Sequence, residues 1–225
     1  MTDRSLVTPE TRTRVKRLGE PIALFFGRLG LTPNGLTLIG FGITAIAAAL
    51  AAAQLWLAAG LVVFFGGVFD MFDGTLARAT GRVSRTGAFM DSVFDRWGEA
   101  VFYVGVVVGC SVGRFDVGSG LAAGAMASAF LVSYTRAKSE GLGFTEGTRM
   151  AEVGIAPREV RLVVLAVGIV ACGLAGGVGP GAALALSMTA AQLWLAGALA
   201  VIVVLATVTV IQRVLFVLSQ DRTRP

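Results

Sequence analysis

The chain has 225 residues, a net charge of +5, a hydrophobic content of 55% and a mean hydropathy of +0.78. Only 15% of the residues are charged, against roughly 25% in soluble proteins, so the composition indicates an integral membrane protein rather than a soluble one. Histidine is absent, which excludes histidine-based acid–base catalysis, phosphohistidine intermediates and histidine-containing metal sites.

The order of basic and apolar segments predicts an all-α membrane protein with one domain over 1–225. Residues 1–30 form a juxtamembrane segment, and residues 8–29 have the pattern of an amphipathic surface helix, with a solvated basic tail as the alternative. The first twenty residues contain no apolar h-region, so no cleavable signal peptide is expected. Six transmembrane helices are then expected within a bundle over about 32–215. They cover about 32–53, 56–77, 86–111, 118–138, 158–177 and 190–215.

The distribution of Arg and Lys predicts the orientation of this bundle. The basic residues gather before the first span, around Arg82, between the fourth and fifth spans and after the sixth, and Arg114 alone occupies a loop on the opposite side. By the positive-inside rule, the basic face is cytoplasmic. We therefore expect a multi-pass protein of the cell (inner) membrane whose active site faces the cytoplasm, and no nucleic-acid partner. Cys110 and Cys172 lie in apolar runs and are expected to be buried free thiols.

Four aspartates, in or beside two of these apolar stretches, are the feature that composition does not explain. A carboxylate in a membrane segment costs roughly 2.5–3.5 kcal/mol on insertion scales. Asp73 lies nine residues before Arg82 and Asp91 nine after it, while Asp70 lies twelve before and Asp95 thirteen after. A helical hairpin that reverses at Arg82 would therefore bring all four carboxylates to the same depth.

Four carboxylates so close together need cations to stay ionised, and oxygen ligands favour Mg²⁺, Mn²⁺ or Ca²⁺ over zinc or copper. Gly74, Ala77 and Gly87 share the faces of the acids and would leave space for a ligand, although tight helix packing is the alternative explanation for each. Arg78 is placed to bind phosphate oxygens, or else serves as a positive-inside anchor.

Written as D-x2-D-G-x2-A-R-x8-G-x3-D-x3-D, residues 70–95 resemble the signature of the CDP-alcohol phosphotransferases (CDP-alcohol phosphatidyltransferases). The resemblance implies transfer of a phosphatidyl-type group from a CDP-linked lipid, such as CDP-diacylglycerol, to an alcohol, with release of CMP. It implies Mg²⁺ or Mn²⁺, with two ions expected, and a homodimer. The implied metal ligands are Asp70, Asp73 and Asp91, with Asp95 as the general base and a possible fourth ligand. The implied nucleotide contacts are Asp73, Gly74, Ala77, Arg78 and Gly87.

Residues 31–37 are similar to the TPNxLT stretch that opens the first span in this family, which implies that Asn34 and Thr37 contact the nucleotide. The alternative is ordinary helix-start chemistry around Pro33. An acidic cluster that is partly dry would also raise the proton affinity of Asp95, as a general base near neutral pH requires.

A second set of polar and basic residues, Ser133, Arg136, Arg158, Arg161 and Arg213, bears on the acceptor alcohol. Its arrangement is similar to that in the phosphatidylinositol phosphate synthases, which implies a pocket for the phosphate of inositol phosphate. The implied pocket residues are Ser133, Arg136, Arg158, Arg161 and Arg213, and positive-inside anchoring is the alternative for each arginine. Glycerol 3-phosphate, an archaeal-type lipid donor and serine stay open as alternative substrates. A cation transporter that uses intramembrane aspartates is the alternative from another functional class.

Overall fold

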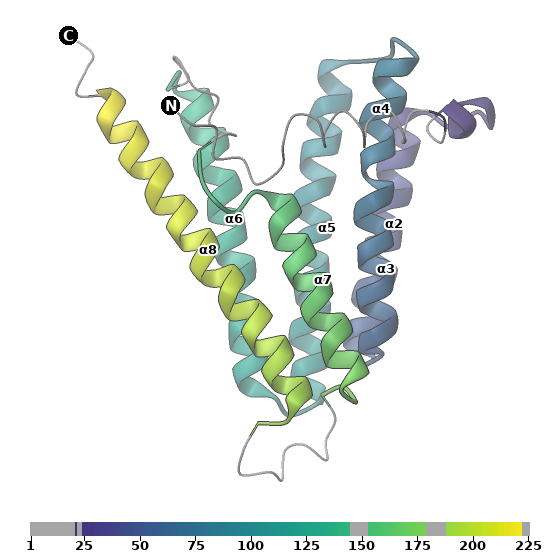
Figure 1. Cartoon of the computed structure of the whole chain (residues 1–225). Coiled ribbons are helices and arrows are strands. Elements are labelled where there is room, and N and C mark those ends of the chain that lie inside the picture. The colour runs from purple at the N-terminus through teal and green to yellow at the C-terminus, as the bar shows by residue number, and fades with distance from the viewer. Residues whose placement is uncertain (1–20, 22–23, 145–152, 179–187, 222–225) are drawn as a thin grey trace.

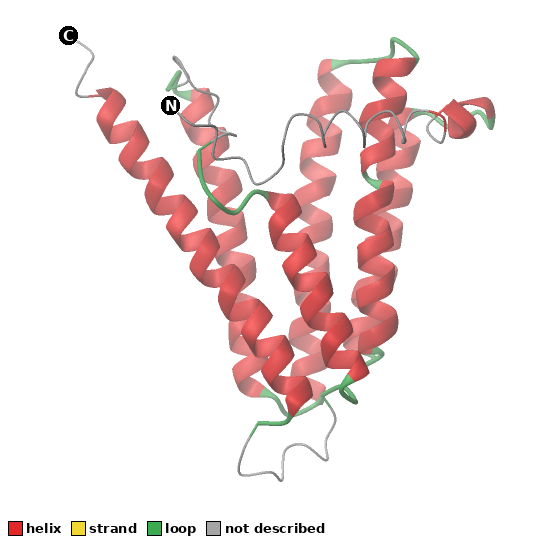
Figure 2. Ribbon diagram, in the orientation of Figure 1, coloured by secondary structure: helices red, strands yellow, loops and turns green. Residues whose placement is uncertain are grey.

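The computed structural model describes residues 21, 24–144, 153–178 and 188–221, and among these every regular element is a helix (Figure 2). The predicted surface helix over 8–29 lies largely outside the described residues; of it, residues 24–28 are helical. The helices are α2 (Pro33–Ala52), α3 (Trp56–Phe69), α4 (Met71–Ala79), α5 (Arg85–Val112), α6 (Asp116–Gly141), α7 (Arg158–Leu174) and α8 (Ala190–Asp221). The all-α prediction is thus confirmed for the described residues.

Local chemistry explains where the two helices that frame the site begin. The hydroxyl of Thr32 accepts from the Gly35 amide at 3.1 Å, and Pro33 occupies the first turn of α2, where its missing N–H costs nothing. The hydroxyl of Ser84 caps α5 by accepting from the Gly87 amide at 2.9 Å. Between α4 and α5 the chain reverses through Gly81, whose φ of +67° is a left-handed conformation that glycine adopts without strain.

The helices pack side by side, with α2 against α3 and α5, α7 against α3 and α8, and α6 against α5 and α8. Figure 1 shows the α4–α5 turn and the C-terminal ends of α6 and α8 at one end of the molecule. The α2–α3 and α5–α6 connections lie at the other end. The predicted basic clusters around Arg82, Arg136 and Arg213 therefore gather at the first of these ends.

Within the described ranges, four helical segments are long and apolar enough to cross a membrane by length and composition, namely Pro33–Ala52, Trp56–Ala79, Asp116–Gly141 and Ala190–Gln220. The second of these segments joins α3 and α4 through Asp70. The remaining two predicted spans correspond to α5, which carries charged residues in its first half, and α7, which has 17 residues. The count of six spans therefore stays a prediction, whereas the membrane character of the chain is clear.

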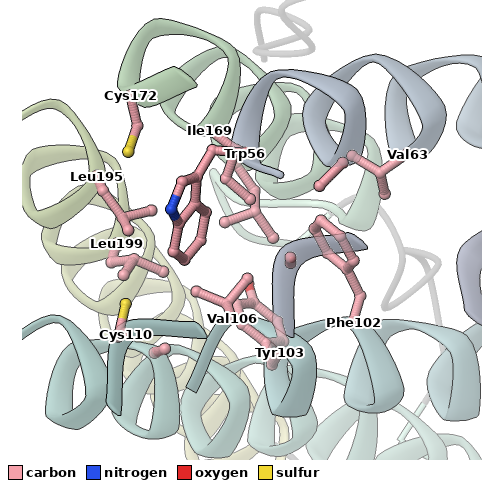
Figure 3. Packing of buried hydrophobic residues seen from close by; sticks show 14 of the residues in the cluster. Trp56, Val63, Phe102, Tyr103, Val106, Cys110, Ile169, Cys172, Leu195 and Leu199 are labelled. Atoms are coloured by element: carbon pink, nitrogen blue, oxygen red, sulfur yellow. The ribbon is translucent and has the colours of Figure 1, made fainter. Parts of the chain in front are cut away.

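The main core is formed by buried side chains of α2, α3, α5, α6, α7 and α8. Figure 3 shows the Trp56 indole from the start of α3 among side chains of α5, α7 and α8, including Val106, Ile169 and Leu195. Cys110 and Cys172 are buried and free in this cluster, as predicted. Such packing gives the bundle a rigid base, from which the polar end projects.

Candidate functional site

The polar end of the bundle brings the four motif aspartates together from three helices. Asp70 lies at the α3–α4 junction and Asp73 in the first turn of α4, while Asp91 and Asp95 lie one turn apart on α5. The charge of Asp70 acts on Asp73, Asp91 and Asp95, so the four carboxylates lie close enough to interact electrostatically.

Arg158, from the first turn of α7, links two of these carboxylates. Its Nη1 atom lies 2.7 Å from Asp70 Oδ2 and 2.8 Å from Asp95 Oδ1. Because both oxygens contact the same nitrogen, α3 and α5 must hold their carboxylates on either side of one cation-sized space. The Nε atom of Arg158 is buried and has no hydrogen-bond partner among the described residues.

The cluster also supplies the type of donor atom, carboxylate oxygen, that a hard divalent cation prefers. Its donors are carboxylate oxygens, and a positive group already lies between two of them. Among the described residues, no three His, Cys, Asp or Glu side chains are close enough together to coordinate one ion. The reason is visible in the geometry, because Asp70 and Asp95 point at Arg158 whereas Asp73 points at Thr37.

Asp73 is oriented by α2. The Thr37 hydroxyl donates to Asp73 Oδ2 at 2.8 Å, and both side chains are buried, with 6% exposure each. The other oxygen of Asp73 accepts from the amide of Gly74. Two hydrogen bonds to one carboxylate hold its orientation.

The residues predicted to contact a nucleotide line the neighbouring turns. A Cβ on Gly87 would lie 3.4 Å from Asn34 Oδ1, so the start of α2 faces the first turn of α5. A Cβ on Gly74 would lie 3.4 Å from the Arg78 guanidinium, whose Nη2 donates to Thr75 Oγ1 at 3.4 Å. Arg78 is exposed and Ala77 half-buried, one turn beyond Asp73. Thr37 and the Gly74 amide hydrogen-bond to Asp73, whereas the others border the acidic cluster without hydrogen-bonding to it in the described part of the chain.

The second basic set divides into residues with different surroundings. Arg213 on α8 is 5% exposed, donates to the carbonyls of Val132 and Val153, and makes no ion pair within the described residues. Its charge acts against those of Arg136 and Arg161, so these three arginines lie close together. Arg136 forms an exposed pair with Glu140 at 3.0 Å, and Ser133 is half-buried next to Val132.

Arg161 differs from the other basic residues because it is fully paired. It is 2% exposed and forms a two-pronged ion pair with Glu99, which is 4% exposed. Glu99 lies within the predicted span 86–111 and outside the aspartate motif, so the motif does not indicate it. Its spacing of four residues from Asp95 could have indicated it, because that spacing continues the face on which Asp91 and Asp95 lie.

The sequence and the fold were also compared with those of known proteins. Residues 30–218 match the family model described as CDP-alcohol phosphatidyltransferase. An archaetidylinositol phosphate synthase from Pyrococcus horikoshii is 32% identical over 161 residues, covering 72% of this chain and 79% of the relative. A phosphatidylinositol phosphate synthase from Streptomyces avermitilis is 31% identical over 175 residues, covering 77% of this chain and 69% of the relative.

The fold is similar to that of a solved enzyme, the phosphatidylinositol phosphate synthase of Mycobacterium tuberculosis. Its crystal structure with CDP-DAG bound superposes with a TM-score of 0.74 at 25% identity, covering 89% of this chain and 94% of that one. A second crystal structure, in complex with manganese and citrate, gives the same TM-score and covers 88% of the solved chain.

Proposed function

Because the chain belongs to the CDP-alcohol phosphatidyltransferase family, we propose that it transfers the phosphatidyl group of CDP-diacylglycerol to the hydroxyl of inositol phosphate and releases CMP. The observation that carries this proposal is the convergence of Asp70 and Asp95 on one cation, Arg158. The inositol acceptor is supported by the names of the relatives from Pyrococcus and Streptomyces, and the donor by the solved relative with CDP-DAG bound. The reaction is a step of phospholipid biosynthesis.

Metal ions, Mg²⁺ or Mn²⁺ and two in number, belong to the proposal. Asp70, Asp73, Asp91 and Asp95 would bind them, and a manganese complex of the solved relative supports this choice. Bound metal neutralises the charge of a pyrophosphate link and stabilises the leaving nucleotide. The chain's own contribution is orientation, because Thr37 fixes Asp73 and α2 packs against both α4 and α5.

Asp95 is the proposed general base. Its carboxylate takes the proton of the acceptor hydroxyl, the acceptor oxygen forms a bond to the lipid-linked phosphorus, and the bond from that phosphorus to CMP breaks. CMP leaves with the electron pair, so atoms and charge balance. Asp95 is half-buried, its side chain is 15% exposed, and it lies beside Arg158, where an acceptor that carries a phosphate would be attracted.

The CDP-lipid would contact the residues that border the acidic cluster on the α2 and α4 side. These residues are Asn34, Thr37, Asp73, Gly74, Ala77, Arg78 and Gly87. The small side chains at positions 74 and 87 support this assignment, because each leaves room next to a polar group, the Arg78 guanidinium or the Asn34 amide.

The acceptor phosphate would bind between α6, α7 and α8, at Ser133, Arg136, Arg158 and Arg213. Arg213 supports this pocket most strongly, because its buried guanidinium lacks an anionic partner among the described residues. The fifth predicted residue, Arg161, differs from these four because Glu99 already occupies its guanidinium.

The placement of the protein completes the proposal. The matched residues form one domain of six spans in the cell membrane, with the acidic cluster at the cytoplasmic face. The gathering of basic residues at the α4–α5 end supports this orientation. Homodimerisation stays a prediction, and light scattering of the protein purified in detergent tests it.

The test of the proposed function is CMP release by purified protein in detergent with Mn²⁺. CDP-diacylglycerol and CDP-archaeol are each offered with inositol 1-phosphate, glycerol 3-phosphate, inositol or serine. We expect CMP with inositol 1-phosphate and none from Asp95→Asn protein. Release of CMP only with glycerol 3-phosphate or serine would contradict the proposed acceptor. If none of the four acceptors gave CMP, the enzymatic proposal itself would be contradicted.

A further inference from the structure

The buried pair of Glu99 and Arg161 uses every nitrogen of the arginine. Arg161 Nε lies 3.1 Å from Glu99 Oε1, Nη2 lies 3.0 Å from Oε2, and Nη1 donates to the Ala156 carbonyl at 2.9 Å. All three nitrogens are engaged, and with 2% exposure Arg161 offers a ligand almost no accessible surface, although Nη1 and Nη2 each keep one further N–H. Arg158, one helical turn earlier, retains a buried Nε without a partner among the described residues.

The third contact of Arg161 connects the pair to the segment that precedes α7. The Ala156 amide donates to the Thr209 hydroxyl at 3.0 Å, and Arg213 Nε donates to the Val153 carbonyl at 3.0 Å. Residues 153–157 are thereby tied to α8, and through Arg161 and Glu99 to α5. This segment leads directly into Arg158, whose guanidinium must span the gap from α7 to Asp70 and Asp95.

Glu99 also lines the narrow pocket in which Arg158 contacts Asp70. Asp70, Glu99 and Arg158 all line this pocket, together with Thr44 and Leu162. The charge of Glu99 acts on Arg158 as well as on Arg161. A single carboxylate on α5 therefore attracts both arginines of the first two turns of α7.

We propose that Glu99 is a positioning residue: through Arg161 it fixes the start of α7, so that Arg158 and Arg213 meet the acceptor phosphate and Arg161 does not. The proposal rests on the proposed function and deepens it by separating the two α7 arginines. Packing alone does not require the pair, because apolar residues of similar volume commonly replace buried ion pairs without loss of stability. The pair is therefore assigned a role in the geometry that it sets, which the experiments below test.

The first test is Glu99→Gln, because the two roles of Arg161 predict opposite results. If Glu99 positions α7, the acceptor KM rises about tenfold or more, while the donor KM stays within about twofold. If Arg161 were instead a phosphate ligand, loss of the competing carboxylate would free its guanidinium, and the acceptor KM would fall or stay unchanged. That second result would overturn the proposal. Glu99→Asp, which keeps the charge, should recover part of the acceptor affinity.

Glu159→Gln is the matched control, because it removes the same charge from an exposed position in the first turn of α7. It should leave both KM values unchanged, and a rise equal to that of Glu99→Gln would overturn the proposal by showing a general charge effect.

A double variant, Glu99→Leu with Arg161→Met, covers the case in which Glu99→Gln fails to fold. An apolar pair should preserve the thermal stability of the protein yet raise the acceptor KM as far as Arg161→Met alone does. Wild-type acceptor affinity in this folded variant would show a purely structural pair and overturn the proposal. Wild-type protein that releases no CMP with any acceptor contradicts the proposed function itself, which distinguishes that failure from a failure of Glu99 alone.

Discussion

At the residue scale, the orientation of a carboxylate in the acidic cluster can depend on a single hydrogen-bonding side chain. Asp73 illustrates this, since it is buried and its one side-chain partner is the Thr37 hydroxyl within the described residues. Thr37 also donates to its own helix at the Pro33 carbonyl, 3.2 Å away, as many threonines do in helices. Of the two hydrogen bonds of Thr37, the one to Asp73 is therefore the one that bears on the site.

We expect Thr37→Val to raise the Mn²⁺ concentration for half-maximal CMP release by about 10- to 100-fold, the usual cost of losing an outer-shell partner. The change keeps the shape of the side chain and removes the hydroxyl that donates to Asp73 and to the Pro33 carbonyl. Titration of activity with Mn²⁺ at saturating substrates measures the effect.

Thr44→Val is the control for this prediction. Thr44 lies on the same helix and donates to the Gly40 carbonyl at 3.1 Å, in the same manner, without bonding a carboxylate. Equal Mn²⁺ requirements in both variants would contradict a role of Thr37 in orienting Asp73.

At the element scale, the site requires α2 and α5 to approach closely. A Cβ on Gly105 would lie only 2.3 Å from the Ala48 carbonyl oxygen and 2.7 Å from Ala48 Cα, so glycine is the residue that permits this contact. Small residues at such crossings are typical of helices in lipid, where packing replaces the hydrophobic effect between helices. The same crossing sets the distance between Thr37 and Asp73 on one side and Asp91 and Asp95 on the other.

Gly105→Ala should therefore destabilise the protein by about 1–3 kcal/mol, because the added methyl group forces two backbones apart. The midpoint of thermal unfolding in detergent measures this loss. Gly120→Ala, on an exposed face of α6 where no atom lies within 4 Å of the added Cβ, should leave the midpoint nearly unchanged. An equal shift in both variants would show that the α2–α5 crossing is not specially constrained.

The helices themselves were largely predictable from hydropathy. Predicted spans at 32–53, 86–111 and 118–138 correspond to α2, α5 and α6 with ends shifted by no more than about three residues, because apolar length and capping residues are local signals. The junction at Asp70, which separates α3 from α4, was not predicted, because apolar composition continues through it.

At the scale of the whole molecule, one end carries both the charge and the chemistry. All four motif aspartates lie near the α4–α5 end, together with Arg136, Arg158 and Arg213. A transport pathway would instead need acidic groups spread through the depth of several spans. The distribution favours surface chemistry on a lipid that diffuses laterally, with the second substrate supplied from the aqueous side.

Cysteine labelling tests this orientation in membrane vesicles. Val83→Cys, in the α4–α5 turn where the native side chain is 68% exposed, should react with an impermeant maleimide only in inside-out vesicles. Asp116→Cys, at the exposed start of α6, should react only in right-side-out vesicles. The native Cys110 and Cys172 are fully buried and should give little background. The reverse pattern would contradict the cytoplasmic placement of the acidic cluster.

The sequence by itself determined the membrane character, the helical class and the family. Each of these depends on local information, namely runs of apolar residues and a motif of fixed spacing from Asp70 to Asp95, and the family prediction was confirmed. The spacing of the aspartates about Arg82 also predicts that the four carboxylates lie at one depth, because two antiparallel helices joined by a short turn leave little freedom in depth.

Only the tertiary structure decided which partners the charged residues take. Asp70 and Arg158 are 88 residues apart in sequence, and Glu99 and Arg161 are 62 apart, so no spacing rule connects them. The two arginines of α7 look equivalent in the sequence, yet the packing of α7 against its neighbours points one at the acidic cluster and the other at Glu99. A buried charge must find a partner within reach, and which partner is within reach depends on how helices distant in sequence cross.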